Sequence, residues 1–292
     1  MAEFFPASEL LINDDGSVFH LHLRPDQLAD KVILVGDPDR VSVVADHFES
    51  RECDVRNREF HAMTGCFRGK RISVISTGIG CDNIDIVLNE LDALANIDFK
   101  TRQVKKQLRS LEIVRIGTCG GLQPDTPVGT FVCSAKFVGL DALLNFYQGR
   151  DKCCDTALEQ ALLKHLGWTG HTCSPLFYAV EADQELSTRI AGKEMLRGIT
   201  VTANGFYGPQ GRELRVPLAD PLQNEKLRSF EYQGLRITNL EMEGSAIAGL
   251  GRILGHRATT VCMVIANRFA KDADTNYRQS LDDLIRMALE RI

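Results

Sequence analysis

Two arginines and a glycine turn are the residues of this sequence best suited to bind an anion. The segment 36–40 (GDPDR) follows an apolar run and precedes a helical pattern, so free backbone N–H groups and Arg40 meet at a helix N-terminus. Arg115 stands inside the apolar run 111–116, where a guanidinium is costly unless an anion pairs with it. Because guanidinium groups bind two phosphate oxygens at once, the pattern predicts a phosphate site. A plain tight turn at Gly36 and a structural salt bridge of Arg115 are the alternatives.

Two glutamates are suited to bind a sugar beside that anion. Glu241 and Glu243 flank Met242 at the end of an apolar run, and the alternation of an extended chain sends both carboxylates to one face. One carboxylate can accept hydrogen bonds from two adjacent hydroxyl groups. Helix capping is the other use of a glutamate here, since a helical pattern follows.

Alternating strands and helices must position these residues. Apolar runs typical of strands cover 31–35, 71–76, 111–116, 129–138, 177–180, 199–203, 235–240 and 258–266. The run 111–116 is expected to stop at the glycines of 117–121. Helical spacing occurs after Pro38, at 84–91, 156–166 and 245–254, and near the C-terminus, where Ser280 and Asp283 are expected to form a cap. Since parallel strands need crossover helices, we predict a single-domain α/β fold, a three-layer α/β/α sandwich around a mostly parallel mixed sheet.

Composition limits the classes of function. The 292 residues include 44% hydrophobic and 25% charged residues, and the net charge of −5 offers no general basic surface for nucleic acid or anionic membrane. No run is apolar enough to span a membrane, and the start lacks a signal-peptide pattern, so we expect a cytoplasmic protein. We expect one domain over 19–292 after an N-terminal extension over 1–18.

Three features suggest other functions and are judged weak. The nine cysteines are odd in number and scattered, and the pair Cys153-Cys154 has no zinc-ligand spacing around it, so we expect it at the surface without a metal. The basic stretch 100–109 lacks interleaved aromatics for stacking on nucleic acid and is predicted to be a solvated insertion. The glycines of 77–80 lack the third glycine of a dinucleotide fingerprint, which disfavours an oxidoreductase.

Eight motifs in order make the chain resemble the nucleoside phosphorylase superfamily, and within it the uridine phosphorylases. They are FHLHL (19–23), VGDPDRV (35–41), NREF (57–60), STGIG (76–80), VRIGTCGG (114–121), GFYGPQGR (205–212), NLEMEGSA (239–246) and VIANR (264–268). The resemblance implies reversible phosphorolysis of uridine, with deoxyuridine as a further substrate, to uracil and ribose 1-phosphate. A purine nucleoside phosphorylase, a nucleoside hydrolase of the same superfamily and a nonenzymatic nucleoside-binding protein are the alternatives.

The resemblance also implies roles for single residues. The phosphate site would comprise Gly36, Arg40, Arg115, Thr118 and, from a neighbouring subunit, Arg58. The ribose site would comprise Thr118, Met242, Glu243 and, also from the neighbour, His20. The base site would comprise Phe206, Gln210, Arg212, Ile265 and Arg268. The residues implied in catalysis are Arg115, Gln210, Arg212 and Glu243. Glutamine and arginine together complement the acceptor-donor-acceptor edge of uracil.

Further expectations follow from the same resemblance. Phosphate is a co-substrate and no metal or organic cofactor is needed, although Glu59 and Asn83 stand at the family's monovalent-cation site, where Asn83 replaces a serine. The protein is expected to be at least a homodimer with shared active sites, whose packing the insertions near 96–110 and 148–173 would alter. Purine-cleaving relatives place an aspartate where this chain has Asn267-Arg268. Arg115→Ala is expected to lose most phosphorolysis while the fold stays intact.

Overall fold

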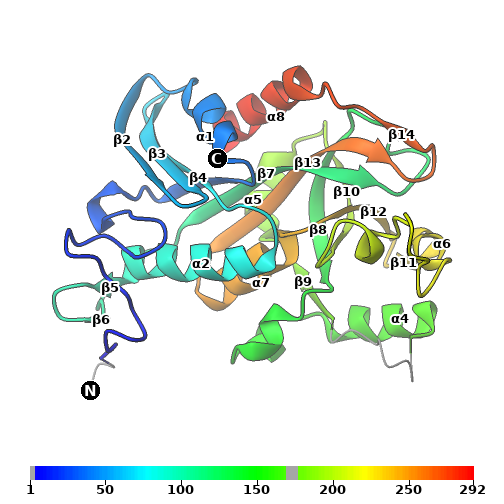
Figure 1. The fold of residues 1–292 in the computed structure, drawn as a ribbon, viewed down its shortest axis with the longest axis horizontal. Helices are drawn as coiled ribbons and strands as arrows, with labels where there is room; N and C mark the ends of the chain where they lie inside the picture. Colours follow the sequence, from blue (N-terminus) through cyan, green and yellow to red (C-terminus); the bar gives the residue numbers. More distant parts are fainter. Residues whose placement is uncertain (1–3, 169–176) are drawn as a thin grey trace.

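The structure, a computed structural model, describes residues 4–168 and 177–292 and contains one large mixed sheet (Figure 1). Its strands follow the order β11 (Glu231–Tyr232), β12 (Leu235–Glu241), β10 (Leu196–Thr202), β8 (Phe131–Gly139), β13 (Arg257–Asn267), β7 (Glu112–Gly121), β1 (Lys31–Val35), β4 (Lys70–Ser76), β3 (Phe60–Phe67) and β2 (Ser50–Asn57). β14 (Asp272–Ala273) pairs with β13, and β9 (Tyr178–Glu181) pairs with β8. β1 is parallel to β4 and β7, β13 to β7, and β10 to β8 and β12. The predicted α/β fold is confirmed.

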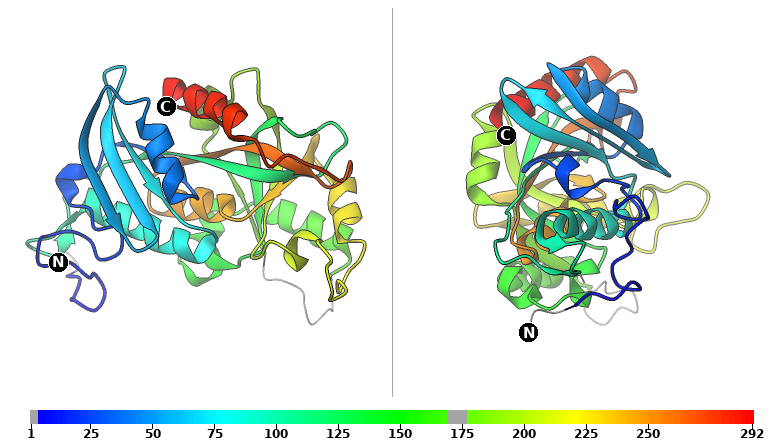
Figure 2. Two further views of the ribbon diagram at one scale, coloured as in Figure 1. Left: turned by 45° about the horizontal axis from the view of Figure 1, so that its top comes forward. Right: turned by 90° about the vertical axis from the view of Figure 1, so that its left-hand side faces the viewer.

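Helices cover both faces of the sheet (Figures 1 and 2). One apolar core includes side chains of α2 (Cys81–Asn96) and α7 (Gly244–Ile253). The opposite core includes side chains of α1 (Pro38–Ala45), α5 (Gln184–Ala191) and α8 (Arg278–Arg291). A third cluster joins α4 (Thr156–Leu166) and α6 (Gln223–Ser229) to the end of the sheet that carries β12. These apolar faces give the three predicted layers.

Strand β7 is longer than predicted, because the glycines after Ile116 continue the strand instead of ending it. β13 pairs with β7 as far as Gly121. A Cβ on Gly117 would lie 2.2 Å from a guanidinium nitrogen of Arg115, so glycine is needed where that side chain lies back over the strand. The glycines therefore make room for Arg115.

Three other expectations at the level of local structure were incomplete or wrong. The hairpin of β2 and β3 was missed, because β2 (SRECDVRN) is a polar edge strand without an apolar run. The last helix begins at Arg278 with Tyr277 as N-cap and no side-chain cap, so the expected cap of Ser280 with Asp283 is wrong. Cys153 is buried and Cys154 partly buried, so that pair does not lie at the surface as predicted.

The two predicted insertions differ in structure. Within 96–110, β5 (Ile97–Asp98) and β6 (Gln103–Val104) form a short hairpin, and Arg102 Nε donates to the carbonyl oxygen of Phe5 at 2.7 Å. The other insertion includes α3 (Arg150–Cys153) and α4, and its residues 169–173 lie outside the described part of the chain. The first insertion thus fastens the N-terminal segment to α2.

Glu112 neutralises three cations where β1, β7 and β13 begin. It pairs with Lys31 Nζ at 2.6 Å, with Arg189 Nη2 at 2.8 Å, and with Arg257. Burial alone would raise the pKa of Glu112, but the hydrogen bonds from Lys31 and Arg189 outweigh it and lower this pKa from 4.5 to about 2.

The low pKa of Glu112 predicts an acid-sensitive contribution to stability. As the pH falls below 4.5, the unfolded chain takes up the Glu112 proton before the folded chain does, so this stabilisation is present above pH 4.5 and is lost toward about pH 2. Glu112→Gln should therefore lower the free energy of unfolding at neutral pH and weaken its decline below pH 4.5. Urea unfolding at a series of pH values measures both. Identical pH dependence in the variant and the wild type would refute the assignment.

Candidate active site

The glycine turns 36–40 and 77–80 lie side by side at the carboxyl ends of β1 and β4. Val35 is in register with Ser76 of β4 and with Ile116 of β7. A Cβ on Gly36 would lie 3.4 Å from the carbonyl oxygen of Gly78, so the two turns nearly touch. The Asp37 carboxylate accepts from the backbone N–H of Asp39 at 3.0 Å, so Asp37 caps α1. The remaining N–H groups of this helix N-terminus suit an oxyanion.

Arg115 is 5% exposed and pairs with both candidate sugar-binding glutamates. Its Nη2 donates to Glu243 Oε2, and its Nη1 lies 3.3 Å from Glu241 Oε2. Burial alone would lower the pKa of Arg115, but Glu243 and Glu241 outweigh it and raise that pKa. The structural salt bridge considered as the alternative for Arg115 is therefore present. The carboxylates that supply it are those predicted to share one face.

Positive charge without a carboxylate partner nevertheless remains at these turns. The Nε atom of Arg115 is buried and has no hydrogen-bond partner. Arg40 Nη1 lies 3.5 Å from the carbonyl oxygen of Ile116, and no carboxylate in the described chain lies within ion-pair distance of Arg40. Burial, and secondarily the charge of Arg115, lower the pKa of Arg40. An anion bound between Arg40 and Arg115 would relieve this repulsion.

Backbone and side-chain donors hold the two glutamates in place. Glu243 Oε1 accepts from the N–H of Gly80 at 2.8 Å, directly before α2. Glu241 Oε2 accepts from the N–H groups of Glu243 and Gly244 at 2.9 and 2.8 Å, so Glu241 also caps α7. Its Oε1 accepts from the Thr202 hydroxyl. Burial and the nearby Glu243 raise the pKa of Glu241 against the opposing effect of Arg115. Sequence patterns gave no signal for Thr202, whereas Gly80 belonged to a recognised glycine turn.

Four of the five candidate base-site residues form one cluster. Gln210 is 3% exposed, and its Oε1 accepts from Arg212 Nη1 at 2.8 Å and from Arg268 Nη2 at 3.3 Å. The Arg212 guanidinium carbon lies 3.5 Å from the ring centroid of Phe206, a cation–π contact. Burial, and secondarily Arg268, lower the pKa of Arg212 to about 10, so it is protonated at neutral pH. The cluster therefore presents hydrogen-bond donors beside an aromatic face.

The strands β7, β12 and β13 carry or support the remaining residues. Thr118 is partly exposed on β7, two positions before Gly120, and a Cβ on Gly120 would lie 3.3 Å from Arg268 Nε. Ile265 is the bulged residue of β13, and a bulge changes the direction of a side chain. The carbonyl oxygen of Met242 accepts from the Cys81 thiol at 3.3 Å. The backbone N–H group of Arg268 donates to the carbonyl oxygen of Gly121 at 2.8 Å, which connects the base-site residues to the end of β7.

His20 and Arg58 both lie beside Phe19. His20 Nδ1 is 2.7 Å from Glu90 Oε1, and the Arg58 guanidinium lies over the Phe19 ring at 5.2 Å. Glu90 lies roughly 14 Å along α2 from the residue after Gly80, at the rise of an α-helix. The structure therefore holds His20 at Glu90 and away from Gly80, which binds Glu243, and it places the Arg58 guanidinium over the Phe19 ring.

No group of three or more His, Cys, Asp or Glu side chains in the described part of the chain is arranged to hold a metal ion. A Cβ on Gly78 would lie 2.4 Å from Asn83 Nδ2 and 3.7 Å from Glu59 Cγ, so the two residues of the candidate cation site flank that glycine. None of the helices described is long and apolar enough to span a membrane.

Known proteins are similar to this chain over most of its length. A uridine phosphorylase of Thermococcus kodakarensis is 28% identical over 278 residues, covering 93% of this chain and 85% of the relative. A DeoD-type purine nucleoside phosphorylase of Oceanobacillus iheyensis is 26% identical over 279 residues, covering 94% and 98%. The crystal structure of a Trypanosoma brucei nucleoside phosphorylase that shows uridine phosphorylase activity superposes with a TM-score of 0.87 at 29% identity, covering 97% of this chain and 98% of that one. The family described as "Phosphorylase superfamily" matches residues 30–292, and this chain belongs to it.

Proposed function

We propose that the protein is a uridine phosphorylase that converts uridine and phosphate to uracil and ribose 1-phosphate. The observation that carries the proposal is the position of Arg115 between the glycine turn 36–40 and Glu243. Its Nη2 contacts the candidate ribose carboxylate, while its Nε has no partner and the neighbouring Arg40 has no carboxylate partner among the described residues. A phosphate bound by the two arginines would lie next to a sugar bound by Glu243.

The proposed chemistry uses charges that this chain supplies. As the glycosidic bond breaks, the sugar gains positive character, which the phosphate dianion stabilises while its oxygen forms the new bond to C1′. The departing uracil gains negative charge, and Arg212, protonated at neutral pH with its pKa of about 10, donates to it. Holding both substrates together lowers the entropic part of the barrier. This proposal requires no metal or organic cofactor.

Uracil binding would require a rearrangement of the Gln210 side chain contacts. The N3–H group of uracil needs an acceptor, but Gln210 Oε1 already accepts from Arg212 and Arg268. The bond from Arg268 is the longer, at 3.3 Å against 2.8 Å, so we expect it to give way. Uridine would then replace one guanidinium donor with its own N–H group.

Asn267 is unsuited to act as the acid that a purine leaving group would use. Its Nδ2 donates to the carbonyl oxygens of Gln123 and Thr126 at 3.0 and 2.7 Å. Its Oδ1 accepts from the N–H groups of Phe269 and Ala270 at 2.8 and 2.7 Å. The side chain is thus fully used in holding the loop after β13, which favours a pyrimidine over a purine substrate.

A panel of nucleosides tests the proposed specificity. Uridine, inosine and methylthioadenosine, each with and without phosphate, are incubated with the protein, and free base is measured by chromatography. We expect uracil release that depends on phosphate, with little cleavage of either purine nucleoside. Faster cleavage of inosine than of uridine would assign the protein to the purine-cleaving members.

A shared active site predicts complementation between two defective chains. If Arg58 and His20 serve the neighbouring subunit, a dimer of one Arg58→Ala chain and one Glu243→Gln chain has one complete site. Co-expression in equal amounts should then restore about a quarter of wild-type activity for a two-fold symmetric dimer. Steady-state rates of the purified mixture, compared with each variant alone, give the answer. A mixture no more active than the mean of the two variants would exclude sharing through Arg58.

A further inference from the structure

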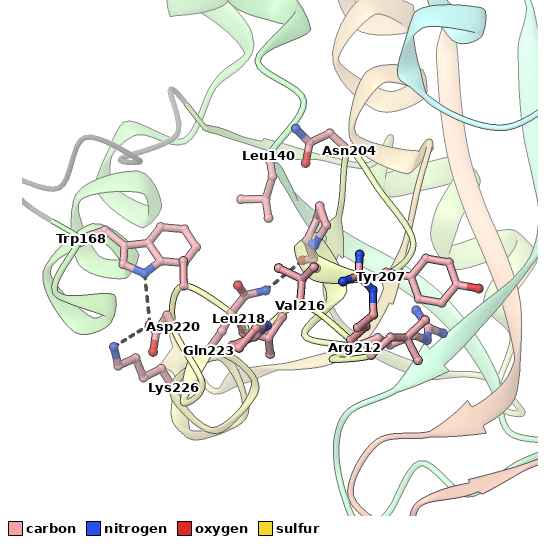
Figure 3. A pocket seen from close by; sticks show the side chains of 16 residues that line it. Leu140, Trp168, Asn204, Tyr207, Arg212, Val216, Leu218, Asp220, Gln223 and Lys226 are labelled. Carbon is pink, nitrogen blue, oxygen red and sulfur yellow. Dashed lines mark hydrogen bonds and ion pairs between the residues drawn. The ribbon is translucent and has the colours of Figure 1, made fainter.

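A large cavity lies beside the loop that carries the base cluster, yet neither Arg115 nor Glu243 lines it (Figure 3). Its volume is about 850 Å³, within the range of small-molecule sites. Trp168 and Arg212 lie on opposite sides of it, and Leu140 and Asn204 lie at a third side. The cavity is therefore separate from the proposed phosphate and ribose sites, but it shares Arg212 with the base cluster.

Apolar side chains form much of the wall. The segment 211–222 contains no helix or strand, and it carries Leu214, Val216 and Leu218 into the lining. Leu214 is 73% exposed and Val216 is 69% exposed, although both border this hollow. The Trp168 indole supplies a flat aromatic surface. Such a wall suits a planar, apolar ligand body.

The charges of the lining favour an anion. Asp220, the only acidic residue among the described residues of the lining, is paired with Lys226 Nζ at 2.7 Å and accepts from Trp168 Nε1 at 3.5 Å. Arg212 and Arg215 have no carboxylate within ion-pair distance among the described residues. One neutralised acid and two unpaired guanidiniums leave the cavity positive, and guanidinium groups bind carboxylate, sulfonate or phosphate oxygens well.

We propose that this cavity is a second ligand site, which binds a small aromatic anion with its ring between Trp168 and the 214–218 segment and its anionic group at Arg215 and Arg212. A ligand there would draw the Arg212 guanidinium away from Gln210 and from the Phe206 ring, which it now contacts. The bound anion would thereby weaken binding of the nucleoside base by Arg212. This second effect rests on the proposed function, whereas binding of the anion in the cavity does not.

Trp168 provides the test, because it is the only tryptophan in the sequence. The full chain, without nucleoside or phosphate, is titrated with anilinonaphthalene sulfonate, an aromatic anion that accepts energy from tryptophan. We expect saturable loss of Trp168 emission with one probe per chain. Arg215→Ala and Val216→Asp should each weaken the affinity by about tenfold, since one removes a charged hydrogen bond and the other adds a repelling charge.

Val104→Asp is the matched control, because Val104 is 43% exposed on β6, outside the cavity lining. It should leave the affinity unchanged. Absence of energy transfer from Trp168, or equal affinity of Val216→Asp and the wild type, overturns the site. In turnover assays the probe should raise the KM for uridine and not that for phosphate. Binding with an unchanged KM for uridine would overturn the link through Arg212.

Discussion

Replacing Arg115 by alanine is expected to lower kcat/KM for uridine phosphorolysis by about 100- to 1000-fold, the usual effect of removing one fixed charge donor at a reacting centre. Arg115 is the residue that contacts Glu243 and lies beside Arg40, so its loss would affect both the phosphate and the ribose positions. Initial rates at varied phosphate and uridine concentrations measure the effect. Near-normal activity of the variant would contradict the phosphate assignment.

The ion pairs of Arg115 change the expectation that its removal leaves the fold intact. Alanine would leave the buried carboxylates of Glu241 and Glu243 without the ion-pair partner Arg115. Breaking a buried ion pair costs about 3–5 kcal/mol. Urea unfolding should show that loss, so rates are best compared at temperatures where the variant is folded. Arg286→Ala is the matched control: its exposed pair with Asp282 on α8 should contribute little to stability, and the variant should keep wild-type activity.

Glu243→Gln is expected to reduce kcat/KM for uridine on the order of 100-fold, because hydrogen bonds to sugar hydroxyls that strengthen in the transition state contribute several kcal/mol. Glutamine keeps the size of the side chain and an oxygen to accept from the Gly80 N–H group. It removes the charge that pairs with Arg115. The variant thus separates the chemistry of the carboxylate from its packing.

The comparison of uridine with deoxyuridine gives this variant a specific signature. If Glu243 binds the 2′-hydroxyl, the loss should be larger for uridine than for deoxyuridine, so the ratio of their kcat/KM values falls. Glu185→Gln, an exposed glutamate paired with Arg257, should change neither value. An equal loss for both nucleosides would place Glu243 away from the 2′-hydroxyl.

The ends of β1 and β4 could be predicted from the sequence, because each of these apolar runs stops at a glycine turn. The turn at Gly36 and the face shared by Glu241 and Glu243 followed from backbone geometry alone. The partners of Arg115 did not, since Glu243 is 128 residues away in the chain and its ion pair depends on the order of strands. The glycines after Arg115 were wrongly predicted to end β7. They make room for the Arg115 side chain, a packing requirement that the local sequence pattern does not show.

The base cluster shows a different limit of sequence reasoning. Gln210 and Arg268 are 58 residues apart, and nothing in the local pattern of either indicates that they bond to each other. Their joint role was predicted only through the resemblance to a family. Beside them, the cavity between Trp168 and the 214–218 segment is formed by a loop without a periodic pattern, so it could not be predicted from the sequence.

Phosphorus NMR of a reaction mixture tests phosphorolysis most directly. The protein is incubated with uridine and inorganic phosphate, and the phosphate resonance is followed while uracil is measured in the same samples. We predict that ribose 1-phosphate appears in equal amount to uracil and that neither forms without phosphate. Uracil release with free ribose and an unchanged phosphate signal would contradict phosphorolysis and show a hydrolase instead.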